Sequence, residues 1–231
     1  MTPDHTSQAL DCRCYKRGAT LDPHQANRLK MVRRLLSGCQ GRALDYGCGY
    51  GDIAHAVSGQ FSEIIGVDLS PERVEWARRE FSPISFQVCL ANSLEFADGT
   101  FQTVISIVVI NWVNDPDLYL REIHRVLAPG GKLVLAAAAP DRLRNLIRAS
   151  LGRHPAKLGF WNESVQQMTL RLQRQGFQVE AADCFYDPLR ESFGHLKKLI
   201  SGMALMPMRI CGIPAFAPYY GVRAVKMHKF S

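Results

Sequence analysis

The chain has 231 residues, of which 47% are hydrophobic and 21% are charged, and its formal net charge at pH 7 is +7. This composition excludes general disorder and fits one globular domain with a substantial core. The seven cysteines are scattered, and the N-terminus lacks the basic and then apolar order of a signal peptide, so we expect a cytoplasmic protein with no metal site.

The positive charge is concentrated in the C-terminal part of the chain. Residues 141–231 hold 14 Lys and Arg against 6 Asp and Glu, whereas residues 1–140 hold 14 against 15. Such asymmetry favours an anionic partner, namely nucleic acid, an anionic membrane surface or an acidic substrate. The structural alternative is a solvated basic surface without a partner.

The predicted elements begin with a helix over 22–37, which Asp22 can cap and Pro23 can start. Strand-like and helix-like runs then alternate. The strand-like runs lie at 42–47, 63–69, 84–89, 102–110 and 132–139, and the helix-like runs between them lie at 52–58, 71–80 and 116–127. Because the strand-like runs are apolar on both faces and are separated by helices, they predict a doubly wound α/β fold with a parallel sheet.

After Pro140 the pattern is less regular. It predicts helices over 141–151 and 163–175, a sixth strand in GFQVEAADCFYD and a seventh near 220–227. No repeat or linker is evident, so we expect a single domain over 1–231. Its expected parts are an N-terminal cap segment at 1–40, a core at 41–140, and a sheet completion at 141–231 that includes a substrate lid at 188–219.

The most informative stretch is LDYGCGYG at 44–51. Gly47, Gly49 and Gly51 alternate between a predicted strand and a predicted helix, and Asp68 ends the next predicted strand. Glycine allows positive backbone dihedral angles and the close approach of a ligand, and the following helix directs free N–H groups toward that ligand. A carboxylate at the end of the next strand can accept both hydroxyls of a ribose. This pattern predicts a nucleoside site.

The spacing of the glycines narrows the ligand. A dinucleotide fingerprint, GxGxxG, needs glycine at position 52, which is Asp52 here, and an acid there repels a pyrophosphate. No Gly-Lys-Ser/Thr follows the turn, which excludes a P-loop. We therefore expect a ligand with a ribose and without a phosphate at this turn.

These motifs, together with LEFADGTF at 94–101 and FQTVISIVVINWVNDPDLYLREIHRVLAPGGKLVLAAA at 101–138, resemble the class I S-adenosylmethionine (SAM)-dependent methyltransferases. Within them the chain is most similar to the methyltransferase type 11 group, which contains quinone-type C-methyltransferases and many small-molecule O-methyltransferases. The resemblance covers about residues 40–140. It implies a seven-stranded Rossmann-like sheet with the last strand antiparallel, and SAM as the cofactor.

The resemblance also implies roles for single residues. Asp45 and the turn Gly47–Gly51 would hold the methionine end of SAM, and the backbone near Ser106 and Ile107 would meet its ammonium group. Asp68 would bind the ribose hydroxyls, and Leu69 would cover one face of the adenine.

Two positions depart from the family pattern. Leu90 stands where many members have an acid that accepts the adenine amino group, so we expect Asn92, or the backbone of Ala91, to serve instead. Gln102 replaces the acid of an Phe-Asp pair. Neither departure touches the glycine turn.

Trp112 follows the fourth predicted strand, where the resemblance places the methyl acceptor. Its ring could face the cationic methyl donor or stack on a flat substrate, and the structural alternative is that it closes the core. Asn111 could orient an acceptor oxygen or cap the next turn. His124 lies in the middle of a predicted helix, opposite the expected site, and we assign no catalytic residue.

Residues 192–206 place apolar side chains on one helical face beside Lys197 and Lys198. The segment is too short and too interrupted to span a bilayer. A basic amphipathic helix lies on an anionic membrane, forms a lid, or packs on its own sheet.

We therefore expect a SAM-dependent methyltransferase for an apolar small-molecule or lipid-like acceptor, with transfer to O or C and peripheral membrane contact through 192–206. One alternative is an RNA methyltransferase, which the sequence disfavours because no basic groove with stacking aromatics is evident. The other is a non-catalytic SAM-binding partner subunit.

Overall fold

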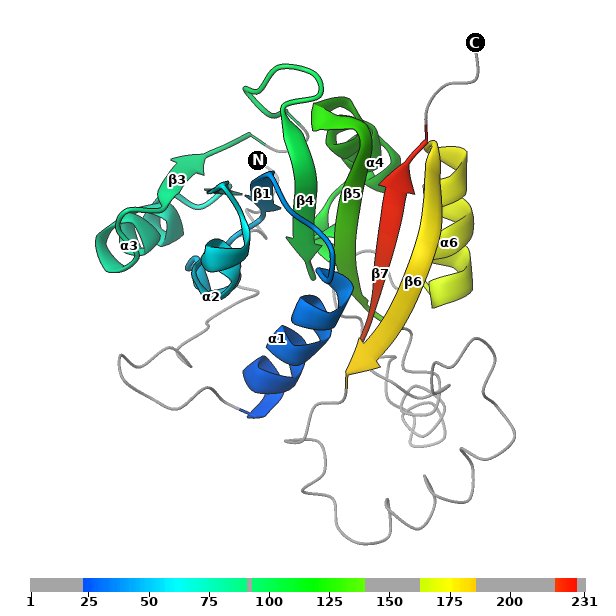
Figure 1. Ribbon diagram of the computed structural model, residues 1–231, viewed down its shortest axis with the longest axis horizontal. Helices are drawn as coiled ribbons and strands as arrows, with labels where there is room; N and C mark the ends of the chain where they lie inside the picture. Colours follow the sequence, from blue (N-terminus) through cyan, green and yellow to red (C-terminus); the bar gives the residue numbers. More distant parts are fainter. Residues whose placement is uncertain (1–22, 91–92, 140–162, 186–218, 228–231) are drawn as a thin grey trace, which may run out of the picture.

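The computed structural model describes residues 23–90, 93–139, 163–185 and 219–227. These residues form one seven-stranded sheet in the order β3-β2-β1-β4-β5-β7-β6 (Figure 1). The strands are β1 (Arg42–Tyr46), β2 (Glu63–Asp68), β3 (Ser85–Val88), β4 (Phe101–Ile107), β5 (Leu127–Ala138), β6 (Phe177–Phe185) and β7 (Tyr219–Lys226). The first five strands pair in parallel, and β7 runs antiparallel to both β5 and β6. The predicted sheet and its antiparallel last strand are confirmed.

Helices cover both faces of the sheet, as the doubly apolar strands predicted. One face packs on α1 (Pro23–Leu35), α2 (Asp52–Val57) and α3 (Pro71–Glu80), whose buried side chains share one core cluster (Figure 1). The other face packs on α4 (Pro116–Val126) and α6 (Val165–Arg174), which share a second cluster. Short 3-10 turns lie at η1 (Ser58–Gln60) and η2 (Ile110–Trp112).

Three of the helices begin where a capping side chain is available in the sequence. Ser70 accepts a hydrogen bond from the backbone N–H of Arg73 at the start of α3, and Pro71 occupies the first turn. Asp115 accepts from two backbone N–H groups at the start of α4. Ser164 and Gln167 form a reciprocal capping box at the start of α6. Local chemistry thus sets these helix starts.

The strand β5 begins earlier than its predicted start at residue 132. Leu127 pairs with Phe101, and the regular pairing resumes only at Lys132 with Thr103, after an irregularity. The stretch Ala128–Gly131, whose Pro-Gly-Gly sequence is typical of a turn, lies inside this irregularity, and Gly130 has a φ of 70°. A strand partner therefore extends β5 across a local turn signal.

Several predictions fall outside the described residues. They are the N-terminal cap before residue 23, the helix over 141–151, and the segments 188–219 and 192–206. The single domain over 1–231 with its substrate lid therefore stays a prediction. Within the described ranges, no helix is both long enough and apolar enough to cross a bilayer.

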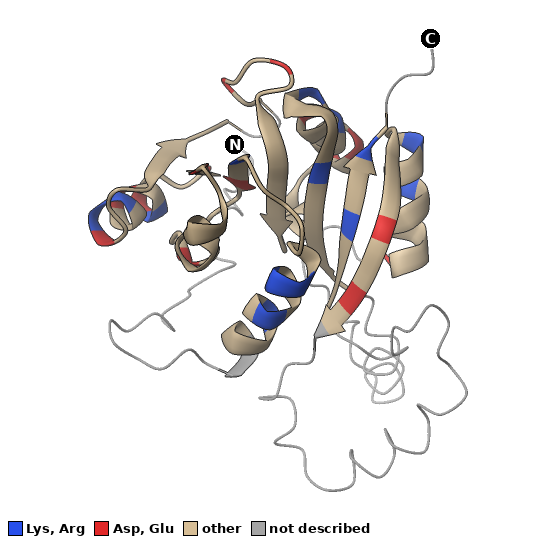
Figure 2. Cartoon of the chain, in the orientation of Figure 1, with Lys and Arg blue, Asp and Glu red and all other residues tan. Residues whose placement is uncertain are grey.

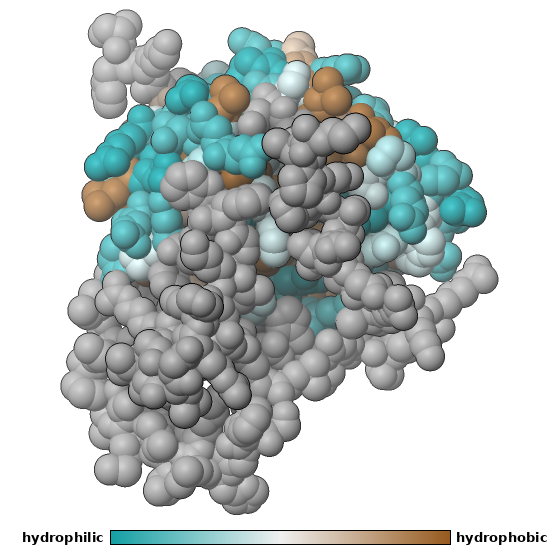
Figure 3. Space-filling view, turned by 180° about the vertical axis from the view of Figure 1, so that it is seen from behind, coloured by the Kyte–Doolittle hydropathy of each residue, from teal (hydrophilic) through white to brown (hydrophobic). Residues whose placement is uncertain are grey.

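Most of the basic surplus also lies outside the described residues. Of the 14 Lys and Arg in 141–231, four are described, against three carboxylates. Lys and Arg on the described surface lie on separate elements, among them α1, α6, β5 and β7 (Figure 2). Seen from behind, that surface is largely hydrophilic, with apolar side chains in small separate patches (Figure 3). An anionic partner for the basic surplus thus stays a prediction.

Candidate functional site

The glycine turn lies between β1 and α2, at the carboxyl edge of the parallel strands. The chain crosses from β2 on one side of β1 to β4 on the other, and this reversal of strand order is where doubly wound sheets bind ligands. Gly47, Gly49 and Gly51 have φ angles of 80°, 56° and 84°. All three adopt the left-handed conformation that favours glycine, as the sequence predicted.

The three glycines face different surroundings. A Cβ atom on Gly47 would lie 2.3 Å from Cγ2 of Val109, and one on Gly51 would lie 2.8 Å from Cζ of Phe86. Among the described residues, no atom lies within 4 Å of a Cβ placed on Gly49. Gly47 and Gly51 are therefore required by packing, whereas Gly49 presents open backbone that a ligand can touch.

Asp68 joins the end of β2 to this turn. Its carboxylate accepts a hydrogen bond from the Gly49 N–H at 2.9 Å through one oxygen and from the Ser70 N–H at 2.9 Å through the other. Each carboxylate oxygen carries a second lone pair, so Asp68 can still accept hydroxyl donors. The residue predicted to bind a ribose thus also fixes the turn beside it.

Asp45 is buried beneath the turn, and its carboxylate accepts a hydrogen bond from the Ala54 N–H at 3.1 Å. Burial, together with the negative charges of Asp68 and Asp52, raises the pKa of Asp45 from 3.8 to about 7, although the Ala54 hydrogen bond acts in the opposite direction. A cationic group placed nearby would favour the ionised form. Asp45 is therefore suited to a positively charged ligand.

This pKa predicts how stability depends on pH. In the unfolded chain Asp45 loses its proton near its ordinary pKa of 3.8, whereas the folded chain keeps that proton up to a pH of about 7. The stability from this group is thus fully present below 3.8 and is lost as pH rises to about 7. We expect Asp45→Asn to remove this loss of stability, which is on the order of 4 kcal/mol. Thermal unfolding from pH 4 to 8 checks it, and equal slopes for both proteins would contradict it.

An apolar rim lies on the β3 side of the turn. Leu69, Val88 and Leu90 are 58%, 47% and 71% exposed, although all three are large hydrophobic residues. Val88 pairs with Asp68 in the β2–β3 register, so the rim adjoins the carboxylate. The sequence singled out Leu69 alone as a cover for a base. Ala91 and Asn92, predicted to contact the adenine, lie outside the described residues.

The end of β4 carries an unusual backbone conformation. Val108 has a φ of 62°, and its N–H donates to the Ala136 carbonyl at 2.8 Å. A β-branched residue is strongly disfavoured in the left-handed region, and such strain gathers at functional sites. Just before it, the buried Ser106 hydroxyl lies 3.0 Å from the Tyr119 hydroxyl, and Ile107 is half-buried.

The strain at Val108 predicts that the usual difference in stability between alanine and glycine variants is reversed at this position. Alanine is normally more stable than glycine by 0.5–1 kcal/mol, but at positive φ the order reverses. We expect Val108→Gly to be more stable than Val108→Ala by about 1 kcal/mol in urea unfolding. At Ser85 in β3, an exposed control, the alanine variant should be the more stable one. The same order at both sites would contradict the prediction.

Asn111 and Trp112 lie in η2, which begins two residues after the strained Val108. The Asn111 side chain is buried, donates to the Ala138 carbonyl at 3.3 Å and accepts from the Ala138 N–H at 2.9 Å. Both ends of its amide therefore hold η2 against the end of β5. Trp112 is half-buried. A contact of either residue with substrate stays a prediction.

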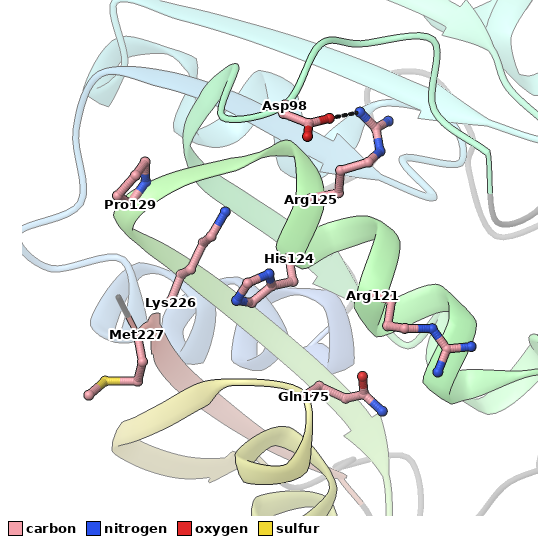
Figure 4. Close-up of a pocket in the computed structure, with 8 residues that line it drawn as sticks. All are labelled: Asp98, Arg121, His124, Arg125, Pro129, Gln175, Lys226 and Met227. Carbon is pink, nitrogen blue, oxygen red and sulfur yellow. Dashed lines mark hydrogen bonds and ion pairs between the residues drawn. The ribbon is translucent and has the colours of Figure 1, made fainter. Parts of the chain in front are cut away.

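A cavity of about 480 Å³ lies elsewhere, at the ends of α4, α6 and β7 (Figure 4). It is lined by Asp98, Arg121, His124, Arg125, Pro129, Gln175, Lys226 and Met227. Two of its cations bind within the protein: Arg125 pairs with Asp98 at 2.7 Å, and Lys226 donates to the Leu127 carbonyl at 2.7 Å. His124 lies here, away from the glycine turn, as predicted. This cavity is thus distinct from the glycine site.

Comparison with known proteins finds similarity over the region that contains the glycine turn and Asp68. Residues 44–135 match a family model described as a methyltransferase domain. The chain is 38% identical over 111 residues to the ubiquinone/menaquinone biosynthesis C-methyltransferase of Desulfotalea psychrophila, covering 46% of this chain and 45% of that protein. It is 29% identical over 203 residues to the malonyl-[acyl-carrier protein] O-methyltransferase of Laribacter hongkongensis, covering 80% and 68%. The chain thus spans less than half the length of the first of these relatives.

A solved structure supports the fold. The complex of the Haloferax volcanii Trm112 methyltransferase activator with a methyltransferase matches with a TM-score of 0.65 and 19% identity, over 89% of this chain and 92% of that chain. The match to the domain family lies over the glycine turn, Asp68 and the strands β1 to β5, which are the parts that build the site. Residues 44–135 thus form a methyltransferase domain that is similar to those of the class I SAM-dependent methyltransferases.

Proposed function

We propose that the protein binds SAM at the glycine turn and transfers its methyl group to a small molecule. The observation that carries this proposal is the open backbone of Gly49, held by its hydrogen bond to Asp68 beside the buried Asp45. Glycine opens the turn to a ligand, Asp68 offers acceptors for a ribose, and Asp45 offers a negative charge to a cation.

The charges of the site fit SAM better than a dinucleotide. Asp52 and Asp68 lie close enough to raise the pKa of Asp45, so three carboxyl groups gather around the turn and would favour a cationic ligand there. The sulfonium and ammonium groups of SAM are positive, whereas a pyrophosphate is negative and would be repelled. The apolar rim of Leu69 and Val88 suits the face of a flat base.

For the acceptor we propose an apolar small molecule or a lipid-like molecule, methylated at O or C. The relatives named above are a C-methyltransferase of ubiquinone/menaquinone biosynthesis and a malonyl-[acyl-carrier protein] O-methyltransferase, so the family resemblance alone does not select the acceptor atom. SAM supplies an electrophilic methyl group, and holding a nucleophile in line with it supplies much of the rate acceleration. Asn111 fixes η2 to Ala138, and we propose that η2 borders the approach of the acceptor.

The first test is calorimetric titration with SAM, with its demethylated product S-adenosylhomocysteine, and with NAD as a control. We expect micromolar binding of the first two and no binding of NAD. Failure of the protein to bind either adenosyl compound would overturn the proposal.

The second test measures transfer of a labelled methyl group from SAM to quinone, fatty-acyl and RNA acceptors. Transfer to a small molecule supports the proposed function, and transfer only to RNA would replace it with the alternative that the basic surplus suggests. Tight binding of SAM without transfer to any acceptor would favour a non-catalytic partner subunit.

A further inference from the structure

The segment from Leu94 to Gly99 connects the apolar rim to the start of β4, and two side chains of α4 hold it. Glu122 accepts a hydrogen bond from the Leu94 N–H at 2.7 Å. Arg125 donates to the Leu94 carbonyl at 2.9 Å and to the Phe96 carbonyl at 2.7 Å. Both backbone groups of Leu94 are thus bound by side chains, as a neighbouring strand would bind them.

Further contacts complete this attachment. Arg125 pairs with Asp98 at 2.7 Å, as Figure 4 shows, and with Glu122 at 2.8 Å. The Gly99 N–H donates to the backbone carbonyl of Arg125 at 3.0 Å. The pKa of Glu122 is lowered, chiefly by its hydrogen bond with Arg125, so the carboxylate stays ionised near neutral pH. One charged pair therefore fixes a six-residue stretch of loop.

The fixed loop is joined to the cofactor side of the sheet. Ser93, next to Leu94, forms an isolated bridge with Leu90, which is the most exposed member of the apolar rim. Cys89, on the other side of Leu90, donates its N–H to the Asp68 carbonyl at 3.0 Å. Leu90 thus lies between two anchors, namely the backbone carbonyl of Asp68, which binds Cys89, and the Glu122–Arg125 pair, which binds Leu94.

We propose that Glu122 and Arg125 are positioning residues for the adenosine half of the cofactor. They hold Leu94, and through the Ser93 bridge they place Leu90 against the rim formed with Leu69 and Val88. Neither side chain touches the cofactor in this scheme. The inference rests on the proposed function, because it assigns the rim to the base of SAM.

A second arginine in the protein offers a matched control. Arg171 of α6 pairs with Glu163 and, at 2.6 Å, with Asp117 of α4. Like Arg125, it is an arginine shared by two carboxylates, and its pKa is raised by the same kind of hydrogen bonds. Its hydrogen bonds to Glu163 and Asp117 join α6 to α4.

The test compares Arg125→Lys, Glu122→Gln and Arg171→Lys. Affinities for S-adenosylhomocysteine and for 5′-methylthioadenosine, which lacks the amino-acid group, are measured at a temperature where circular dichroism shows each variant to be folded. We expect Arg125→Lys and Glu122→Gln to weaken binding of both ligands about tenfold, because the adenosine half is common to them. Arg171→Lys should lower the melting temperature and leave both affinities within twofold.

Folded Arg125→Lys and Glu122→Gln variants that bind both ligands with unchanged affinity would overturn the positioning role, since the pair would then be purely structural. A loss confined to S-adenosylhomocysteine would also overturn it, because the effect would lie at the methionine half. If the unaltered protein bound neither ligand, the proposed function would fail first.

Discussion

Replacing Gly47 with alanine is expected to lower the melting temperature by roughly 9 °C. The added methyl group would lie 2.3 Å from the Val109 side chain, and the φ of 80° would strain any residue other than glycine. Overpacking costs typically 1–3 kcal/mol and a left-handed alanine about 1 kcal/mol more, so we expect about 3 kcal/mol in total. A domain of this size loses about 3 °C for each kcal/mol, and differential scanning calorimetry measures the shift.

Gly49→Ala is the matched control. Compared with Gly47→Ala, it should lower the melting temperature less and weaken ligand binding more. Its φ of 56° carries the dihedral cost of about 1 kcal/mol, but no described atom lies within 4 Å of the new methyl group. The melting temperature should fall by only about 3 °C. The methyl group would instead project into the open space that we assign to the cofactor, so affinity for S-adenosylhomocysteine should fall more than in Gly47→Ala. Equal melting temperatures for the two variants would contradict the assigned packing role of Gly47.

Asp68→Ala should have the largest effect on ligand binding, a loss of about 100-fold for S-adenosylhomocysteine. A hydrogen bond to a charged group contributes about 1.5–3 kcal/mol, and a tenfold change in affinity corresponds to about 1.4 kcal/mol. The change also removes the acceptor for the N–H groups of Gly49 and Ser70, so the turn itself should loosen. Calorimetric titration at a temperature where the variant is folded measures the affinity.

Asp115→Ala is a control that separates the contribution of Asp68 to ligand binding from its contribution to the stability of the turn. Asp115 likewise accepts hydrogen bonds from two backbone N–H groups, at the start of α4. Its loss should lower stability by about 1 kcal/mol, as for other helix caps, and leave the affinity unchanged. If Asp68→Ala bound as tightly as Asp115→Ala, the ribose role of Asp68 would be wrong.

Features set by neighbouring residues could be predicted from the sequence. Ser70, Pro71 and Asp115 start helices through contacts within three residues, and the glycine turn depends on dihedral angles that only the local residue decides. The alternation of apolar strands and helices likewise predicted that both faces of the sheet are buried. The position of the antiparallel strand came from the family resemblance rather than from periodicity.

Features set by distant contacts could not be predicted. The Asn111 amide binds Ala138, 27 residues away, and the sequence gives no sign of that partner. Glu122 and Arg125 are three residues apart, which by itself indicates an ordinary pair on a helix surface, whereas their backbone partners lie about 30 residues earlier. The sequence also contains no indication of the positive φ at Val108, because valine is strongly disfavoured in that conformation.

The place of β7 in the sheet has a consequence for how the protein is made. During synthesis β6 leaves the ribosome before β7, yet among the described strands β6 pairs with β7 alone, which lies between it and β5. The amino-terminal strands β1 to β5 can assemble while translation continues, but β6 must wait for Tyr219–Lys226 to emerge. A ribosome stalled before residue 219 would hold a nascent chain with the glycine turn formed and the sheet unfinished at its far edge. Arrest sequences placed before and after β7 would detect that last step as a late pulling force on the nascent chain.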